Sequence, residues 1–367
     1  MGLRIAQVAA FPFPSPQGSQ VYVQGIARGL AARGHDVRLL CYGHGEGTEE
    51  QGYKIIRTPS VPGYHNMRAG PDWIKPILDA ALAALVVQQD VDILHVHNYE
   101  APLAARLGRM GRKIPMVYSA HNVMSEELHL YFSGRLTQKL AKHAGRLLDQ
   151  LVPRMADHAI AIRPESVEVL KTLGCKQVSC VPPGVSMSDF KSTRSVELGP
   201  GPWVVYSGNP DSYQNLDVLM RAMTLIPDIQ LLMISAASLD HWRGIANVHC
   251  IETSDFELVC AYLRAADLAV LPRVSCSGFP MKILNYLALG LPVVAAEGSA
   301  IKIPGVLSVP NHDAFALAHS IKNILSDRSQ LRVLGLAGQD SVQSNYSWAN
   351  QCEKLEQIYT KLLSKVQ

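Results

Sequence analysis

The sequence of 367 residues has no apolar run that approaches the roughly 18 residues of a membrane-spanning helix. Charged residues make up only 18%, and the formal net charge is +3, so the chain lacks the basic excess of nucleic-acid-binding proteins. Low-complexity tracts and short-period repeats are also missing. We therefore expect a globular protein without a nucleic-acid partner, in keeping with a hydrophobic content of 48%.

The seven cysteines form no Cys-x-x-Cys pair, and their number is odd. This spacing favours reduced thiols in the core of a cytoplasmic protein over a zinc site or a disulfide framework. The apolar segment Leu3–Ala10 is expected to be a buried strand and not a secretion signal. Pro12, Pro14 and Pro16 follow it at once, without a cleavage-site pattern.

Short apolar runs alternate with segments of helical periodicity, in two series. The first predicts strands at Leu3–Ala10, Val37–Cys41, Lys54–Thr58, Ile93–His97, Met116–Ala120 and His158–Ile162, and helices at Val21–Arg33, Ile77–Gln89, Pro102–Met110 and Gly134–Met155. The second predicts strands at Trp203–Ser207, Gln230–Ser235, Asn247–Ile251, Leu268–Leu271 and Pro292–Ala296, and helices at Leu216–Met223, Lys282–Leu289, Ala314–Ser326, Ser329–Asn345 and Ala349–Ser364. Such alternation predicts an α/β fold with two parallel sheets.

The two series are separated by the polar segment Asp189–Pro202, which is typical of a linker. The expected parts are residues 1–185, 186–345 and 346–367. Ligands of open α/β sheets bind beyond the carboxyl ends of the strands. Two such domains that face each other therefore predict a binding cleft.

Two loops between a strand and a helix have the composition of an anion-binding site. They are Pro14–Gln20 and Ser275–Lys282, both rich in small residues. Backbone amides at a helix N-terminus can approach a phosphate there, and Lys282 adds a positive charge. Neither loop is a dinucleotide fingerprint or a P-loop. The first loop is equally compatible with a plain connection, whereas the second favours diphosphate binding.

Histidines lie at the ends of two predicted strands, in His95–Glu100 and in His121-Asn122. A histidine at that position can hydrogen-bond a sugar hydroxyl or a phosphate, or act as a base. His-x-His without a carboxylate or thiolate at ligand spacing is weak evidence for a metal. We expect a functional role for His121, whereas His95 is expected to point into a helix layer. Ser207–Pro210 ends another strand and is either a phosphate-binding turn or an ordinary one.

The order and spacing of these segments resemble retaining glycosyltransferases of family four, over nearly the full length. Such enzymes have the GT-B fold of two Rossmann-like domains with parallel sheets facing across a cleft. The similarity lies in Pro16–Ser19, Leu30–Val37, Asp92–Asn98, His121-Asn122, Val181–Val185, Tyr206–Gly208, Gly278–Pro280 and Gly290–Val294. The final helix, opening at Tyr346–Trp348, is similar to the family helix that crosses back to the first domain.

The resemblance implies an enzyme that moves a hexose from a nucleotide diphosphate sugar to a hydroxyl-bearing acceptor, with retained anomeric configuration. It implies no metal or other cofactor, because positive side chains and helix amides neutralise the leaving diphosphate. His121 is the candidate catalytic residue. The donor is expected at Gly18, Ser19, Ser207, Gly208, Asn209, Gln214, Ser277, Gly278, Phe279, Pro280, Met281, Lys282 and Asn285. The acceptor is expected at Gln20, Tyr22, Asn98, Tyr99, Glu100 and Asn122.

The chain departs from the family pattern at four charged positions. The family's Glu-x7-Glu carboxylates fall on Ser277 and Asn285, and its Arg and Lys in the second domain fall on Asn209 and Gln214. Both carboxylates and two cations are therefore replaced by neutral groups. This keeps two alternatives open, a catalytically inactive sugar-nucleotide-binding or scaffold subunit and another GT-B enzyme such as a sugar-nucleotide epimerase.

The segment 134–155 carries five basic residues and five leucines at helical spacing. Either it lies on an anionic membrane, or it is a surface helix with its leucines in the core and its cations in water. The first alternative gives a lipid-linked acceptor and a peripheral position on the inner face of the membrane. The neighbouring segment Leu128–Phe132 is either an acceptor loop or core.

Overall fold

The computed structural model describes residues 2–14, 17–43, 49–50, 52–61, 72–276 and 278–365. Its contacts divide the chain into two compact units. The first comprises Met1–Gly184, Ser277–Phe279 and Trp348–Gln367, and the second comprises Val185–Cys276 and Pro280–Ser347. Each unit is a parallel sheet covered by helices, so the fold class is α/β with two Rossmann-like halves, as predicted.

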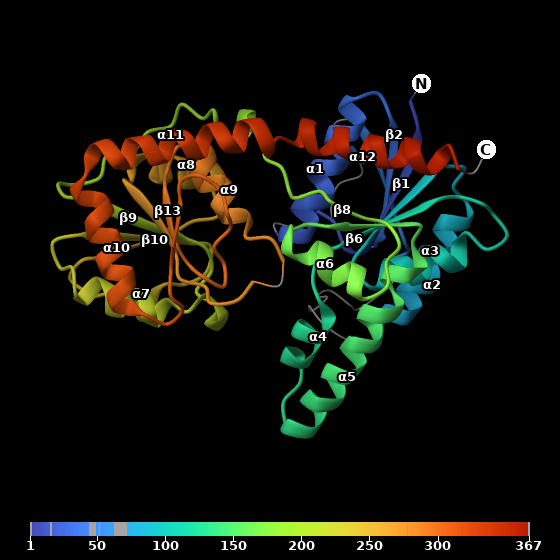
Figure 1. Ribbon diagram of the computed structural model, residues 1–367, viewed down its shortest axis with the longest axis horizontal. Helices are drawn as coiled ribbons and strands as arrows, with labels where there is room; N and C mark the ends of the chain where they lie inside the picture. The colour runs from blue at the N-terminus through green and yellow to red at the C-terminus, as the bar shows by residue number, and fades with distance from the viewer. Residues whose placement is uncertain are drawn as a thin grey trace. The chain divides into compact units, whose positions relative to one another are not determined.

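The first unit contains an eight-stranded sheet in the order β3-β4-β2-β1-β5-β6-β7-β8 (Figure 1). Its strands are β1 Arg4–Pro12, β2 Asp36–Tyr42, β3 Glu49–Glu50, β4 Tyr53–Arg57, β5 Ile93–His97, β6 Met116–Ala120, β7 His158–Ala161 and β8 Val178–Cys180. Only β3 is antiparallel to its neighbour among the described pairs. The chain reverses its direction of travel across the sheet between β1 and β5, which is where such sheets bind ligands.

Helices cover both faces of this sheet because its central strands are apolar on both sides. The helices are α1 Gly18–Ala32, α2 Lys75–Val87, α3 Glu100–Gly108, α4 Met124–Glu127, α5 Arg135–Leu151, α6 Glu165–Thr172 and α12 Trp348–Leu363, with 3-10 turns η1 Leu128–Tyr131 and η2 Pro153–Met155. One core packs α2 and α3 against the sheet, and a second core packs α1 and α12 against its other face. The predicted helix 134–155 ends at Leu151 because Pro153 follows, and Figure 1 shows α5 projecting with α4 beside it.

The C-terminal helix α12 packs on α1 through two glycines one turn apart. A Cβ on Gly25 would lie 2.0 Å from the Trp348 ring, and one on Gly29 would lie 2.4 Å from Cys352 Sγ. Glu356 completes the contact by accepting hydrogen bonds from Arg33. Because the two glycines of α1 have no side chains, those of α12 can pack closely against α1. This packing places α12 in the first unit.

The second unit contains a six-stranded sheet in the order β11-β10-β9-β12-β13-β14. Its strands are β9 Trp203–Ser207, β10 Gln230–Ser235, β11 Val248–Glu252, β12 Leu268–Leu271, β13 Val293–Ala296 and β14 Val306–Val309. Its helices are α7 Leu216–Thr224, α8 Phe256–Ala265, α9 Met281–Ala288, α10 Ala314–Ser326 and α11 Arg328–Asn345, with 3-10 turns η3 Met187–Phe190, η4 Ser212–Gln214 and η5 Asp240–Trp242. Here the reversal lies between β9 and β12.

Some elements were not predicted. His158–Ile162 was expected to close the first half, but α6 and β8 follow it. Of the eight residues of α6 only Leu170 is buried, so the helix shows little apolar periodicity. Likewise β8 has no fully buried residue, and β14 has only Val309. Short elements at the edge of a sheet leave the weakest sequence pattern.

Candidate active-site residues in the two units

Three buried histidines meet in the first unit at the carboxyl ends of neighbouring strands. His95 and His97 belong to β5, and His121 directly follows β6. Their exposed fractions are 0%, 0% and 3%. The His95 and His97 rings stack with 4.5 Å between centroids, and the His97 and His121 centroids are 5.3 Å apart. We call these residues the histidine cluster.

Hydrogen bonds within the cluster set the proton positions on His121. The amide oxygen of Gln7, on β1, can only accept, so His97 Nε2 donates to it. His97 Nδ1 must then accept from His121 Nε2, at 3.1 Å. Both nitrogens of His97 are thereby occupied, and His121 Nδ1 carries a free lone pair when the ring is neutral. Gln7 and His97 thus orient His121.

Burial keeps these rings uncharged. It lowers the pKa of His95 and of His121 to about 3, and it lowers the pKa of His97 well below its usual value, to which its two histidine neighbours also contribute. His95 is further fixed by Tyr359 of α12 at 2.7 Å and by Ser119 at 2.8 Å. The expected position of His95 against a helix layer is therefore correct, and His121 is a neutral hydrogen-bonding group at physiological pH.

The N-terminus of α1 is open toward an anion. Its N-cap residue Gln17 makes no side-chain cap, and its first turn contains no acidic residue. A Cβ on Gly18 would meet nothing within 4 Å. The amides of the first turn, which includes Gly18 and Ser19, therefore receive no side-chain cap from Gln17 and lie at the positive end of the helix dipole.

The other candidates of the first unit differ in accessibility. Tyr22 and Tyr99 are 1% and 8% exposed, and their hydroxyls donate to Val181 O and to Asp149, so both pack within the protein and neither presents a free hydroxyl. Gln20 is also buried.

Asn98 and Asn122 are half-buried, and Glu100 pairs with Lys75 at 3.1 Å. Gly278 and Phe279 group with this unit, where a Cβ on Gly278 would lie 3.0 Å from Asn122 Oδ1.

A lysine with a buried ammonium group lies at the carboxyl ends of β9 and β12 in the second unit. Lys282, in the first turn of α9, has its Nζ 4.9 Å from the centre of the Tyr206 ring. Gly208 follows β9 with φ +146°, and a Cβ there would lie 1.7 Å from Nζ. Only a glycine leaves room for this ammonium beside the backbone. Lys282 Nζ is buried and has no hydrogen-bond partner among the described residues.

The charges around Lys282 favour an anionic ligand. Burial and the nearby Arg273 lower the pKa of Lys282 to about 8, while Asp211 opposes them. Arg273 follows β12 and lies 4.7 Å from the centre of the Tyr213 ring. Two cations that disfavour each other are stabilised together when a negative ligand binds between or beside them. We call Gly208, Arg273 and Lys282 the Lys282 site.

The remaining donor candidates are neighbours of Gly208 or of Lys282 in the sequence. Asn285 is three residues after Lys282 on α9 and shares its face, while Pro280 and Met281 open that helix. Asn209 is exposed and accepts from the Tyr206 hydroxyl through its carbonyl. Gln214 is buried in η4, and the amide of Ser207 donates to the Tyr286 hydroxyl. Ser277 lies outside the described residues.

Three residues of these sites were missed by sequence reasoning. Gln7 lies inside the first apolar strand, His97 was considered only with its neighbours, and Arg273 is a lone cation in a loop. A signal did exist for Arg273, which directly follows the Leu-Pro that ends a strand. Among the described residues, no group of three or more His, Cys, Asp or Glu side chains is placed to hold a metal ion.

The comparisons with known proteins agree over the whole chain. The pattern of the family described as Glycosyltransferase Family 4 matches residues 16–189, and that of Glycosyl transferases group 1 matches residues 201–327. The chain belongs to glycosyltransferase family 4. This enzyme is 24% identical to phosphatidyl-myo-inositol mannosyltransferase of Mycobacterium leprae, over 100% of this chain and 99% of that protein. It is 26% identical to D-inositol 3-phosphate glycosyltransferase of Corynebacterium diphtheriae, over 98% and 95%.

Solved structures show the same fold. Sucrose-phosphate synthase from Thermosynechococcus elongatus superimposes with a TM-score of 0.81 at 20% identity, covering 99% of this chain and 100% of that one. The catalytic domain of starch synthase IV from Arabidopsis thaliana, solved with ADP and acarbose, gives a TM-score of 0.74 at 14% identity, with 99% and 100% covered. These superpositions show that the chain has the GT-B fold. Because the relatives are named as active glycosyltransferases, an inactive scaffold is the less favoured alternative.

Proposed function

We propose that this glycosyltransferase moves a hexose, with retention, from a nucleotide diphosphate sugar to a hydroxyl-bearing acceptor, and that the diphosphate binds at the Lys282 site. The observation that carries the proposal is the buried Lys282 ammonium without a hydrogen-bond partner among the described residues. An uncompensated buried charge is costly, and it persists where a ligand of opposite sign compensates it.

The departures from the family pattern fit this assignment. Asn209 and Gln214 replace two family cations, but Arg273 and Lys282 together place two positive charges near the same strand ends. As the bond between the anomeric carbon and the diphosphate breaks, these two cations stabilise the charge on the leaving group. Asn285 hydrogen-bonds ribose as a neutral group. In the first unit, His121 is the neutral group that hydrogen-bonds a sugar hydroxyl. No metal is required.

A donor panel tests the function. Purified protein is mixed with UDP-, GDP-, ADP-, dTDP- and CDP-sugars without metal, and thermal shifts are recorded. One donor at about a hundredfold excess over its Kd should add roughly 2.7 kcal/mol of stability. NMR of the product's anomeric proton then reports retention. No shift with any donor, or an inverted product, contradicts the proposal, and conversion of the donor without acceptor identifies an epimerase instead.

The pKa of Lys282 predicts how donor affinity depends on pH. Below a pKa of about 8 the side chain is charged, so affinity is constant; above it the proton and the attraction are lost. We expect nucleoside diphosphate affinity about tenfold weaker at pH 9 than at pH 7, measured by calorimetry. Lys282→Arg keeps its charge throughout, so any binding that it retains should be flat over this range. A flat wild-type profile would exclude Lys282 as the binding cation.

For the acceptor, we propose a lipid-linked molecule reached from an anionic membrane surface, with the protein in the cytoplasm. Among the described residues no helix is long and apolar enough to cross a membrane. Leu136, Leu140, Leu147 and Leu151 of α5 are 72%, 63%, 59% and 56% exposed. The interpretation that these leucines are core is therefore wrong.

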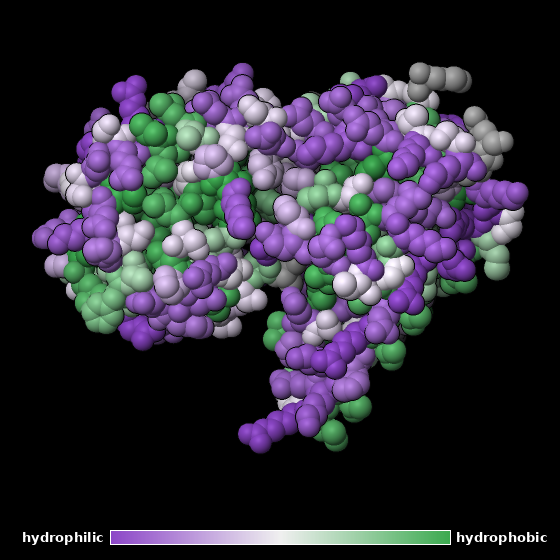
Figure 2. All heavy atoms as spheres, viewed as in Figure 1, coloured by the Kyte–Doolittle hydropathy of each residue, from purple (hydrophilic) through white to green (hydrophobic). Residues whose placement is uncertain are grey.

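The leucines form one stripe along α5, because they lie three or four residues, or a multiple of a turn, apart. Arg135, Lys139, Lys142 and Arg146 form a basic stripe beside it, and Ala141, Gly145 and Asp149 face the protein. Figure 2 shows hydrophobic side chains along one edge of this projecting segment. Leu130, Tyr131 and Phe132 are exposed next to it, whereas Leu128 is buried. This pattern is typical of a helix that lies in a membrane interface.

Placing negative charges in the leucine stripe should weaken membrane binding. We expect Leu140→Glu/Leu147→Glu to bind phosphatidylglycerol-containing vesicles at least about tenfold more weakly in a sedimentation assay, because each buried leucine contributes roughly 1.5–3 kcal/mol. Leu336→Glu is the matched control, since Leu336 is 51% exposed on α11 in the second unit. If both variants bind like the wild type, α5 does not contact the membrane and a soluble acceptor is favoured.

A further inference from the structure

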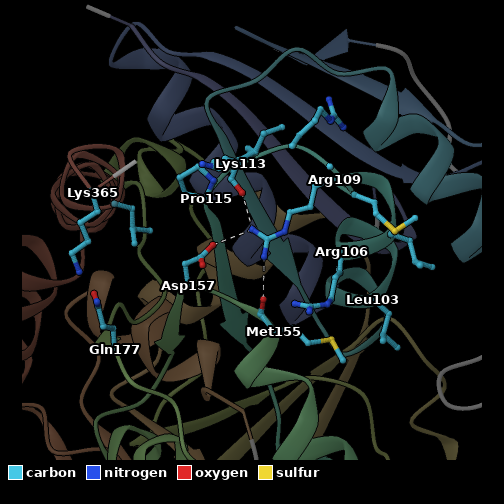
Figure 3. Close-up of a pocket in the computed structure, with 15 residues that line it drawn as sticks. Leu103, Arg106, Arg109, Lys113, Pro115, Met155, Asp157, Gln177 and Lys365 are labelled. Carbon is cyan, nitrogen blue, oxygen red and sulfur yellow. Dashed lines mark hydrogen bonds and ion pairs between the residues drawn. The ribbon is translucent and has the colours of Figure 1, made fainter. Parts of the chain in front are cut away.

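A second surface feature of the first unit lies away from the histidine cluster. It is an open groove of about 1010 Å³, lined by the C-terminal half of α3, the loop 109–115, the segment around Met155–Asp157, and the end of α12 (Figure 3). Pro115 precedes β6, whereas His121 follows it. The groove and the cluster therefore lie at opposite edges of one sheet, separated by the length of a five-residue strand, or roughly 16 Å.

Positive charge is concentrated in this groove. Its lining contains one carboxylate, Asp157, and five cations: Arg106, Arg109, Arg112, Lys113 and Lys365. The net charge of the lining, +4, exceeds the +3 of the whole chain. Such a local excess attracts anions although the protein as a whole is nearly neutral.

Two of these cations build the wall and three remain available. Arg109 donates to Ile114 O at 2.7 Å and to Asp157 at 3.0 Å, as drawn in Figure 3. Arg112 donates to the carbonyls of Val86, Gln89 and Gly108. The side chains of Arg106, Lys113 and Lys365 are exposed and have no hydrogen bond or ion pair within the described part of the chain. Figure 3 shows Lys365 and Arg106 on opposite sides of Arg109.

Apolar side chains rim the same groove. Leu103, Leu107 and Met110 are 43%, 61% and 79% exposed, and Leu103 and Leu107 lie one turn apart on α3. A free anion or a nucleic-acid backbone would make no apolar contact with the exposed leucines and methionine. A phospholipid, by contrast, presents a phosphate and acyl chains together. The chain also connects the groove to α5, because η2 leads from the end of α5 to Met155 in the lining.

We propose that this groove binds the headgroup phosphate of an anionic phospholipid in the bilayer, with Arg106, Lys113 and Lys365 as its ligands and Leu107 and Met110 against the acyl region. The assignment rests on the membrane contact proposed above for α5. It adds a second point of attachment at the edge of the sheet where β6 begins. Two attachments hold the unit in one orientation, and a helix stripe alone leaves it free to roll about the helix axis.

The test compares charge removal in the groove with equal charge removal elsewhere. The full-length variant Arg106→Ala/Lys113→Ala/Lys365→Ala is measured against Arg221→Ala/Lys322→Ala/Arg332→Ala, three exposed cations of the second unit. With vesicles containing about one part in five phosphatidylglycerol, the groove variant should lose about 100-fold in partitioning, at ~1 kcal/mol per cation near the surface. The control should lose less than about threefold. Equal losses of vesicle partitioning in the two variants would overturn the proposal that the groove binds lipid.

Binding of a soluble lipid distinguishes a site for a lipid headgroup from a site for free phosphate. Dihexanoyl-phosphatidylglycerol below its micelle concentration should bind the wild type one to one and shift NMR signals of the groove, while inorganic phosphate at the same concentration should not. Equally strong binding of inorganic phosphate would make the groove a free-anion site and overturn the proposal. Vesicle binding lost in the α5 variant but unchanged in the groove variant would also overturn it, and would leave α5 as the membrane contact. Donor binding by every variant confirms that it is folded.

Discussion

Lys282→Met should weaken donor binding about 100-fold and, at the same time, stabilise the ligand-free protein. Removing the ammonium costs the diphosphate a charged hydrogen-bond partner, so the Kd of the nucleoside diphosphate should rise about 100-fold, or about 3 kcal/mol. The same change removes a buried charge that has no hydrogen-bond partner in the described structure and fills its volume with an apolar chain. We expect the unfolding free energy at pH 7 to rise by roughly 1–3 kcal/mol.

The loss of nucleotide affinity and the gain in unfolding free energy together distinguish a ligand-binding role of Lys282 from a structural one. Calorimetry gives the affinity, and thermal unfolding without ligand gives the stability. Lys322→Met, an exposed lysine on α10, is the matched control and should change neither quantity. If Lys282→Met unfolds more easily and still binds nucleotide, the ammonium stabilises the fold and the diphosphate lies elsewhere.

His121→Ala should lower kcat by about 10²–10³ without changing donor affinity, because the diphosphate is held by other residues. The pKa of His121 is about 3, so its imidazole does not titrate between pH 5 and 9. We therefore expect no ionisation of this residue in the kcat profile over that range. His158→Gln, on β7, is the control and should keep kcat within about threefold.

Gln7 tests how His121 is oriented. Gln7→Leu removes the acceptor for His97 Nε2, so the His97 proton is no longer fixed on Nε2. His121 Nδ1 is then no longer held in its unprotonated form. We expect a kcat loss of about tenfold at unchanged donor affinity, with altered ¹⁵N shifts of the His97 and His121 rings. Gln89→Leu removes another buried glutamine of the same unit and controls for packing. Unchanged ring shifts in Gln7→Leu would mean that another group fixes the tautomer.

Local pattern was sufficient for most of the fold. Short, mostly apolar runs located β5, β6, β9, β10 and β12 with their observed bounds, because strands buried on both faces are predominantly apolar. The same runs located the loops after the strands, and so the regions of His121, Gly208 and Lys282. Elements that bury few residues, such as α6 and β8, left no such pattern.

The grouping of residues within each site depended on sheet order. Gln7 and His97 are 90 residues apart, and they meet because β1 and β5 are neighbours in the sheet. Gly208 lies beside Lys282 for the same reason, since β9, which ends just before Gly208, pairs with β12, which precedes Lys282 in the chain. No periodicity within a segment contains this information. It is set by which strands pair.

By itself the sequence determined that this is a two-part α/β glycosyltransferase, and it determined which residues of each helix share a face. It did not determine which face meets the protein. On α5 the small residues Ala141 and Gly145 pack inward, whereas the four leucines of the stripe face out, the reverse of what hydrophobicity alone predicts. Only the tertiary structure decided this, because a neighbouring helix that approaches closely admits small side chains and excludes large ones.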